Sequence, residues 1–158
     1  MTKVIILSDI HNNTASLRKI DGILTESDYV IFLGDGISAL YPYKNLLGDR
    51  LIMVKGNCDI FSQLSEEVVT EIDGFKIFIT HGHKYHVKEY LDDLMQKAKE
   101  TDADIVLYGH THVAYTDYID GRTVINPGSL GNPRMGNPTY AYMILSGKKP
   151  LVKIVEVR

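Results

Sequence analysis

Seven polar side chains suited to binding a metal ion follow apolar runs in this chain. Two of them, His110 and His112, close the segment "DIVLYGHTH" with one threonine between them. The complete set is Asp9, His11, Asp35, Asn57, His81, His110 and His112. Carboxylate, amide and imidazole ligands together suit Mn, Fe, Ni or Zn better than Ca or Mg. Seven ligands are too many for one ion that keeps an open position, so the set predicts two ions sharing a carboxylate.

Each of these side chains follows a segment that the pattern predicts to be a buried strand. Continuous apolar runs rich in β-branched residues predict strands at 3–8, 29–34, 50–56 and 104–109. A further strand precedes His81, in a hairpin centred on Asp73 and Gly74. Ligand sites of α/β sheets lie beyond the carboxyl ends of the strands. We therefore expect the seven side chains to converge at one edge.

Helices are expected between these strands. Apolar residues at helical spacing predict helices at 14–24, 38–47 and 86–99. The alternation of strand and helix in the first half implies parallel pairing with right-handed crossovers. In the second half, short strands are predicted at 113–119, 122–126, 139–146 and 150–157. This order predicts two packed sheets with helices outside, in a single domain over residues 1–158.

The composition indicates which binding partners and which cellular compartment to expect for this chain. The chain has 23% charged residues and a net charge of −3, so nothing indicates general nucleic-acid binding. No apolar run reaches membrane-spanning length, and the first one meets Asp9 too soon for a signal peptide. The single cysteine, Cys58, excludes an internal disulfide and favours a reducing cytoplasm. A homo-oligomer, dimer or tetramer, is compatible with this sequence.

The motifs "SDIH", "GDG", "GNCD", "THGH" and "GHTH", in this order, resemble those of the calcineurin-like metallophosphoesterases. The short length, the cysteine in "GNCD" and the segment "INPGSLGNPR" resemble the small bacterial and archaeal phosphodiesterase branch. The resemblance extends from Asp9 to Ser129. It implies a four-layer αββα sandwich, in which two mixed β-sheets are flanked by helices.

The resemblance also implies roles for individual residues. Asp9, His11 and His112 would hold one divalent ion. Asn57, His81 and His110 would hold a second ion, and Asp35 would bridge the two. Mn²⁺ is the preferred candidate, with Ni²⁺, Fe²⁺ and Zn²⁺ as alternatives. Water or hydroxide between the ions would attack the phosphorus of a small phosphoester in line with the leaving group. The implied catalytic set is Asp35, Asn57, Cys58, Asp59 and His81.

One position departs from the wider superfamily. Much of it has a histidine where this chain has Cys58, and a thiol is a weaker proton donor than an imidazolium. Asp59 consequently lacks its usual imidazole partner, and substrates with acidic leaving groups, such as aryl esters, are favoured. Alternatively, Cys58 is simply a small half-buried residue near the ions. His83 and Arg134 are candidates for contact with substrate, or else ordinary surface residues.

Two alternative functions remain open at this stage. The same site would also suit a phosphomonoester or a nucleotide, because pocket size cannot be read from the sequence. The retromer scaffold subunit has the same fold and resembles this chain at "HGH" and "GHTH", yet acts mainly through binding partners. It departs from the motif at the "GN" position, whereas this sequence keeps Asn57. The intact ligand set favours catalysis.

Overall fold

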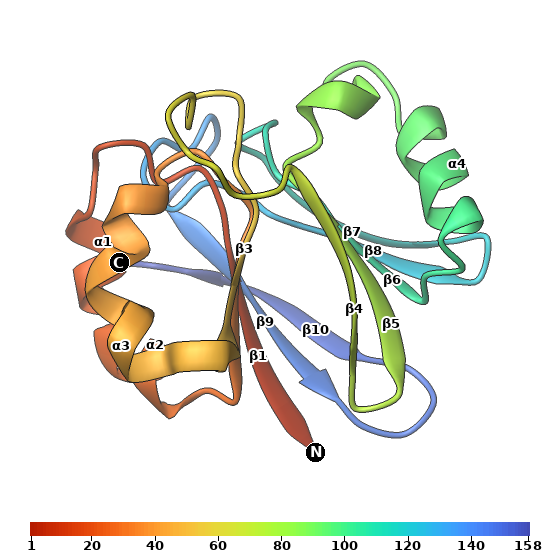
Figure 1. The fold of residues 1–158 in the computed structure, drawn as a ribbon, viewed down its shortest axis with the longest axis horizontal. Helices are drawn as coiled ribbons and strands as arrows, with labels where there is room; N and C mark the ends of the chain where they lie inside the picture. The colour runs from red at the N-terminus through yellow and green to blue at the C-terminus, as the bar shows by residue number, and fades with distance from the viewer.

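The structure is a computed structural model that describes all residues from 1 to 158 and contains two five-stranded β-sheets (Figure 1). The strands of the first sheet are β1 (Thr2–Leu7), β2 (Tyr29–Phe32), β3 (Leu51–Met53), β9 (Thr139–Leu145) and β10 (Leu151–Glu156). Those of the second are β4 (Glu67–Ile72), β5 (Phe75–Thr80), β6 (Ile105–Leu107), β7 (Ala114–Ile119) and β8 (Arg122–Pro127). The strand orders are β10-β9-β1-β2-β3 and β4-β5-β6-β8-β7.

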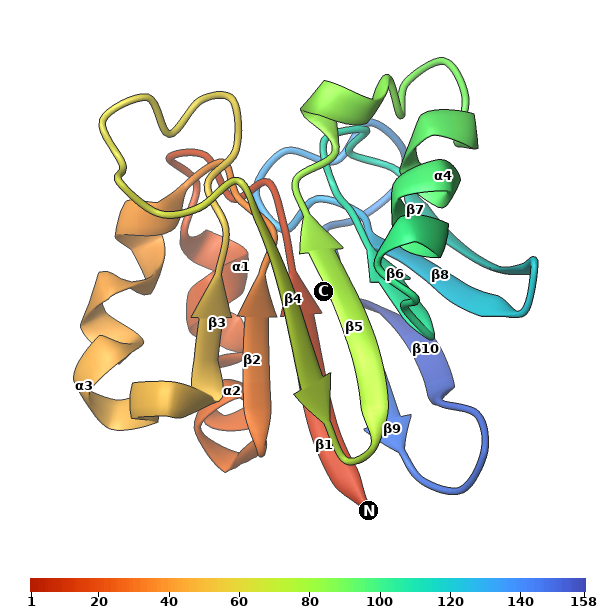
Figure 2. The ribbon, with the colours of Figure 1, turned by 45° about the vertical axis from the view of Figure 1, so that its right-hand side comes forward.

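Both sheets are mixed, and each contains three parallel strands. In the first sheet β1, β2 and β3 are parallel, and β9 runs antiparallel to β1. In the second sheet β5, β6 and β8 are parallel, while β4 and β7 pair antiparallel at the two edges. Figure 2 shows the arrowheads of β2, β3 and β5 pointing toward the same end of the molecule. The loops that follow the parallel strands of both sheets therefore meet at that end.

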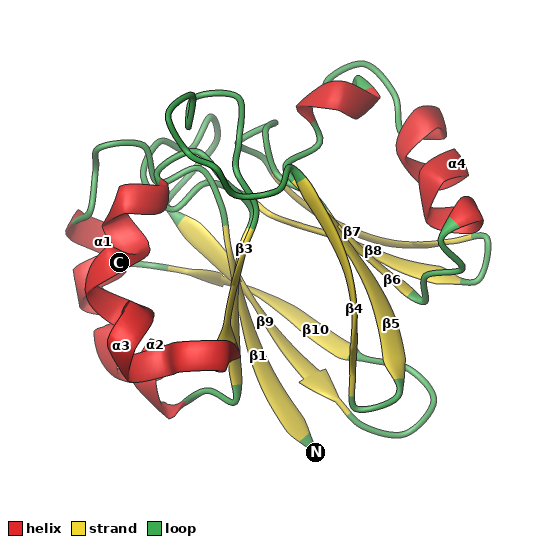
Figure 3. Ribbon diagram, viewed as in Figure 1, coloured by secondary structure: helices red, strands yellow, loops and turns green.

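Helices cover the outer face of each sheet (Figure 3). On the first sheet lie α1 (Ala15–Lys19), α2 (Asp21–Glu26), the 3₁₀ helix η1 (Ile37–Tyr43), α3 (Lys44–Leu47) and the 3₁₀ turn η2 (Gly48–Arg50). On the second lie the 3₁₀ turn η3 (His83–Tyr85) and α4 (Asp92–Glu100). The order of layers is helix, sheet, sheet, helix, which confirms the αββα sandwich expected from the sequence motifs.

Strand β1 is buried on both faces. Val4 and Ile6 belong to the apolar cluster between the two sheets, whereas Ile5 and Leu7 belong to the cluster beneath α1, α2 and α3. All four side chains have 0% exposure. A strand covered on both sides needs apolar residues at every position, so the sequence shows an unbroken run instead of alternation. A third cluster packs β5 and β6 against α4.

The helices differ from their predicted ranges. The predicted helix 14–24 is two helices, because Ile20 leaves the α-helical region at φ −106° and ψ 10°. Most of the predicted helix 38–47 is the 3₁₀ helix η1, which contains Pro42 and therefore lacks one N–H donor. The predicted helix 86–99 begins only at Asp92, because His86 has a left-handed backbone at φ 54° and residues 86–89 form a turn.

The strands agree with prediction within one or two residues, except at 50–56. Strand β3 is limited to Leu51–Met53. Beyond it, the Lys55 N–H pairs with the carbonyl of Ser65 in the following loop. The chain therefore leaves the first sheet before it reaches Gly56 and Asn57.

Candidate metal centre

The seven candidate ligands lie at the end of the molecule where the loops of both sheets meet, at the top of Figure 1. Asp9 and His11 follow β1, Asp35 follows β2, and Asn57 follows β3. From the second sheet, His81 follows β5, while His110 and His112 follow β6. The group therefore spans the boundary between the two sheets, and the convergence expected from the strand ends is present.

Asp9, His11 and His112 form one cluster of ligand atoms within 4.8 Å of one another. The Nε2 atom of His112 lies 3.1 Å from Asp9 Oδ1, and that of His11 lies 3.9 Å from the same oxygen. The two Nε2 atoms are 3.2 Å apart. Three ligand atoms thus face a common point.

Asp35, His81 and His110 form a second cluster. His81 Nε2 lies 3.3 Å from Asp35 Oδ2 and 3.2 Å from His110 Nδ1. The side-chain oxygen of Asn57 lies 3.0 Å from the same His81 nitrogen. This cluster therefore contains one carboxylate, one amide oxygen and two imidazoles.

The two clusters are joined through the Asp35 carboxylate. Its Oδ2 atom lies 3.3 Å from His81 Nε2 and 4.0 Å from His11 Nε2, so it faces a residue of each cluster. Its other oxygen, Oδ1, accepts the Cys58 backbone N–H at 2.8 Å. One oxygen is thereby held by the protein, and the other remains directed between the clusters.

Two imidazoles are oriented by backbone carbonyls. His81 Nδ1 lies 2.8 Å from the Leu33 oxygen, and His112 Nδ1 lies 2.7 Å from the Asn132 oxygen. In the neutral form of each ring, donation from Nδ1 leaves Nε2 with the free lone pair that faces the cluster. Such carbonyl partners fix the tautomer and direction of metal-binding histidines.

The pKa shifts of Asp9, Asp35 and His110 favour ligation. Burial raises the pKa of Asp9, but contact with His112 and the charge of His81 outweigh it, so the pKa lies below its ordinary value. Burial opposes the ionisation of Asp35 in the same way, and His81 again brings the pKa well below normal. Burial and the nearby His81 lower the pKa of His110 to about 4. At neutral pH both carboxylates are anionic and His110 is neutral, the forms that bind metals. Contact with Asp9 raises the pKa of His112, and, against the opposing effect of burial, Asp35 and Asp9 raise that of His81, so a metal ion would displace protons from these two rings.

The surroundings of the Asp9 carboxylate show whether a metal ion fits the site. Its side chain is 0% exposed, and Oδ2 accepts hydrogen bonds from the Ser8 hydroxyl and the His110 N–H. The other oxygen, Oδ1, is buried with no hydrogen-bond partner. A buried carboxylate oxygen without a partner is costly unless a cation faces it. This oxygen points at three imidazoles, so the arrangement fits a divalent ion.

Asp59 lies behind the centre instead of facing it. Its carboxylate accepts four backbone N–H groups, from Asp35 at 2.7 Å, Gly36 at 2.9 Å, Ile37 at 3.2 Å and Gly56 at 2.8 Å. These donors lie in the loops after β2 and β3 and at the first residue of η1. Asp59 therefore ties together the two loops that carry Asp35 and Asn57, an arrangement that sequence reasoning did not anticipate.

The other candidates lie around the centre. Cys58 is exposed, and its sulfur is within 4.8 Å of ligand atoms of His11 and Asp35. His83 packs near both His81 and His110, with ring centroids at 5.6 and 6.2 Å. Arg134 is exposed, and its backbone N–H bonds the His112 carbonyl at 3.2 Å.

The turn after β8 supports the loop of Asp9. The Ser129 hydroxyl donates to the Asp9 carbonyl at 2.7 Å, and Asn126 donates to the carbonyl of Gly109 at 3.0 Å. The "NPGS" segment therefore supports the loops that carry Asp9 and His110. Ser8, Leu33 and Asn132 were not anticipated, although each holds a candidate ligand.

The sequence model of the calcineurin-like phosphoesterase superfamily domain matches residues 2–148 of the chain. The chain belongs to this family. It is 34% identical to a probable metallophosphoesterase of Bacillus subtilis, over 90% of this chain and 83% of that protein. It is 32% identical to a phosphodiesterase of Methanocaldococcus jannaschii, over 89% of this chain and 92% of that protein.

Solved structures of the family agree with the fold. A predicted phosphoesterase from Streptococcus pneumoniae superposes with a TM-score of 0.84 at 30% identity, over 98% of this chain and 89% of that one. The motifs therefore identified the family and its small phosphoesterase branch correctly. None of the helices has the length and hydrophobicity that crossing a membrane requires.

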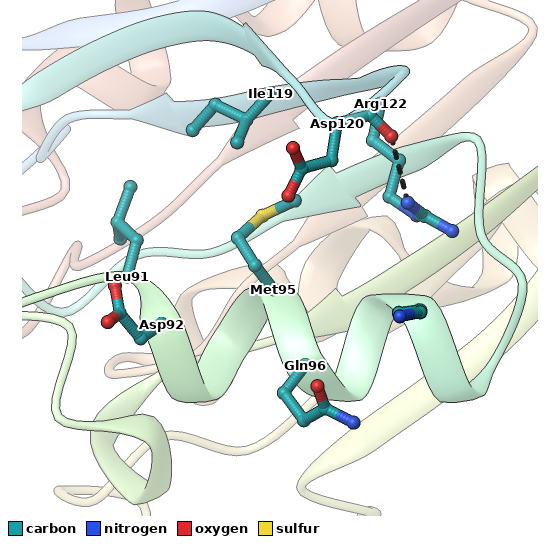
Figure 4. Close-up of a pocket in the computed structure, with 8 residues that line it drawn as sticks. Leu91, Asp92, Met95, Gln96, Ile119, Asp120 and Arg122 are labelled. Atoms are coloured by element: carbon teal, nitrogen blue, oxygen red, sulfur yellow. Dashed lines mark hydrogen bonds between the residues drawn. The ribbon is translucent and has the colours of Figure 1, made fainter.

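A cavity of about 720 Å³ lies away from the candidate metal centre, between α4 and the turn joining β7 and β8 (Figure 4). Met95 and Ile119 form part of its wall. At one side, the Arg122 guanidinium donates to the Asp120 carbonyl at 2.9 Å. The cavity contains none of the seven candidate ligands, so its size does not identify it as the reaction site.

Proposed function

We propose that this chain is a metal-dependent phosphodiesterase that uses two divalent ions. The observation that carries the proposal is the pair of ligand clusters joined through Asp35 Oδ2. In this proposal Asp9, His11 and His112 would hold one ion, Asn57, His81 and His110 would hold the other, and Asp35 would contribute to both. When bound, two such ions supply a water of lowered pKa and neutralise the charge of the phosphate oxygens.

The residues of the chain contribute mainly by positioning. The Leu33 and Asn132 carbonyls aim His81 and His112, so little reorganisation is needed when ligands bind. The Cys58 N–H restrains Asp35, and the Asp59 carboxylate, which accepts four backbone N–H groups, restrains the loops that carry Asp35 and Asn57. A preorganised group of charges stabilises a transition state more effectively than groups that must first be ordered.

The expected leaving group follows from the side chain at position 58. Cys58 is exposed beside His11 and Asp35 and offers a thiol, a weak proton donor. We therefore propose a preference for esters whose leaving group departs without protonation, such as aryl phosphodiesters. The variant Cys58→His should raise turnover of alkyl esters relative to aryl esters. An unchanged ratio would contradict this role for position 58.

The proposal is tested by removing metal and assaying a chromogenic aryl phosphodiester and the matching monoester. Mn²⁺, Ni²⁺, Mg²⁺ and Zn²⁺ are added in turn, to the natural protein and to Asp35→Asn. Diester cleavage that depends on metal and is lost in Asp35→Asn would support the proposal and rank the ions. We expect Mn²⁺ to give the highest rate.

Two other outcomes would replace the proposal. Faster cleavage of the monoester than of the diester would indicate a phosphomonoesterase or nucleotide phosphatase with the same site. No cleavage with any ion, despite two bound ions per chain, would indicate a metal-binding protein-interaction scaffold of the same fold.

A further inference from the structure

A second cavity opens directly beside the candidate metal centre. It has a volume of about 460 Å³ and is lined in part by His11, a candidate ligand. From His11 it extends along α1 and η1, where Thr14 and Ser38 contribute hydroxyl groups. Pockets for small ligands have volumes of roughly 300–1,000 Å³, so this one has room for an organic group attached to a phosphate. We call it the Arg18 pocket.

The Arg18 pocket is positively charged, although the chain as a whole is acidic. Its lining includes one guanidinium, that of Arg18, and no carboxylate. The chain as a whole has 20 acidic residues against 17 lysines and arginines. Arg18 has no ion pair and no side-chain hydrogen bond within the protein. An unpaired guanidinium on a concave wall offers planar donors to a carboxylate or phosphate group.

The remaining walls suit an uncharged connecting chain. Leu17, Ala39 and Pro42 provide apolar surface, and Leu17 is 2% exposed. The buried Tyr43 hydroxyl donates to Asp21 at 2.7 Å. Burial and that hydrogen bond raise the pKa of Tyr43 to about 12, so it adds no charge at neutral pH. The lining therefore combines a candidate metal ligand, apolar side chains and an unpaired cation.

We propose that the Arg18 pocket binds an arm of the substrate that carries a second negative charge. The preferred substrate class is then a phosphoester in which one ester chain ends in an anionic group, a carboxylate or a further phosphate. This inference rests on the proposed function, since it assigns the pocket to the organic part of a phosphoester held beside His11. In this arrangement the phosphate that is hydrolysed contacts the metal centre, and the anionic group at the end of the ester chain contacts Arg18.

The test uses two chromogenic diesters with the same leaving group. One is p-nitrophenyl ω-carboxybutyl phosphate, and the other is p-nitrophenyl pentyl phosphate, whose alkyl chain carries no charge. The measured quantity is the ratio of their kcat/KM values. We expect the natural protein to favour the carboxylate ester by about fivefold, the effect of one favourable partly exposed ion pair. Arg18→Gln should bring the ratio close to one, and Arg18→Lys should retain part of the preference.

Lys19→Gln provides the matched control. Lys19 is the next residue of α1, is exposed, and does not line the pocket, so this variant removes the same charge outside it. Its ratio should equal that of the natural protein. A preference that is unchanged in Arg18→Gln, or lost equally in Lys19→Gln, would overturn the assignment.

A binding measurement separates this inference from the proposed function. Non-hydrolysable phosphonates with the same two chains are titrated calorimetrically into the protein containing Mn²⁺. If neither ester is cleaved but the carboxylated phosphonate binds about fivefold more tightly, and only through Arg18, the pocket stands and the hydrolase proposal fails. If both esters are cleaved with a ratio independent of Arg18, the hydrolase stands and the pocket assignment fails.

Discussion

At the scale of single residues, the backbone of the candidate centre is unusual. Five of the candidate ligands have positive φ angles: Asp9 at 52°, His11 at 52°, Asp35 at 63°, His110 at 69° and His112 at 59°. Side chains with a Cβ rarely adopt this left-handed conformation, and such residues gather at functional sites. Here the neighbouring loops hold it in place, since the His11 N–H bonds the Asp35 carbonyl at 2.8 Å.

The residues that gather at the site could be predicted from the sequence, but the groups that orient them could not. Asp9 and His81 were identifiable because each follows an apolar strand. The Leu33 and Asn132 groups that orient His81 and His112 are backbone carbonyls, which every residue possesses. No residue type marks such a position. The left-handed φ angles of the aspartate and histidine ligands likewise could not be predicted from their residue types.

Asp59 gives the first prediction. Its two oxygens accept four N–H groups, whereas an asparagine would present its own N–H₂ to two of those donors. Asp59→Asn should therefore lower the free energy of unfolding by about 2 kcal/mol. It should also weaken metal binding, because the loops of Asp35 and Asn57 lose their common anchor. Urea denaturation and metal titration measure the two effects.

Asp49→Asn is the control for this substitution. Asp49 is exposed, and its side chain makes no hydrogen bond, so the change should stay within about 0.5 kcal/mol. Equal stability of the Asp49 and Asp59 variants would show that the four hydrogen bonds contribute little.

At the scale of elements, strands were easier to predict than helices. Burial on both faces gives β1 an unbroken apolar run, a signal that does not depend on its neighbours. Helix boundaries depend on single backbone angles that residue spacing does not reveal. His86 has apolar residues at helical spacing after it, yet its φ of 54° is left-handed and residues 86–89 form a turn, so α4 begins only at Asp92. Tertiary contacts, more than local preference, decide such boundaries.

Gly56 gives a prediction about the loop after β3. A Cβ atom added there would lie 2.1 Å from Asp35 Oδ1 and 2.7 Å from the Asp35 backbone nitrogen. Gly56→Ala should therefore displace the carboxylate and reduce metal affinity at least tenfold, the consequence of losing about 1.4 kcal/mol. Calorimetric titration with Mn²⁺ measures the change. An affinity equal to that of the natural protein would mean that Asp35 adjusts freely or does not bind the ion.

Gly22 gives the opposite prediction on α2. It lies inside this helix, and a Cβ atom there would meet no other atom within 4 Å. Gly22→Ala should increase the free energy of unfolding by about 0.5–1 kcal/mol, because alanine loses less backbone entropy than glycine on folding. Metal affinity should not change. A destabilised Gly22→Ala protein would contradict the helical environment assigned to this position.

At the scale of the whole molecule, the candidate centre joins the two sheets. Asp9 and Asp35 come from the first sheet, whereas His81 and His110 come from the second. The sequence predicted both the two-sheet sandwich and the convergence, because parallel strands bring their carboxyl ends to one edge. The relative placement of the sheets depends on many packed side chains, which no local pattern encodes. For this reason the Arg18 pocket could not be predicted from the sequence.

A centre that spans two sheets should link metal binding to the stability of the entire fold. A ligand that binds only the folded state stabilises it by about 2.7 kcal/mol when present at one hundred times its Kd. For a chain of 158 residues this corresponds to a rise in Tm of about 5–10 °C. We expect Mn²⁺ to produce this rise and a chelator to reverse it, measured by thermal denaturation.

The same measurement on Asp35→Asn assigns the effect to the centre. Since Asp35 Oδ2 faces both clusters, its loss should remove more than half of the metal-induced rise, whereas Asp49→Asn should keep all of it. Comparing each variant with and without Mn²⁺ cancels the effect of the substitution on the metal-free protein. A full rise in Asp35→Asn would mean that the stabilising ions bind elsewhere. In that case metal binding at the centre would contribute nothing to the association of the two sheets.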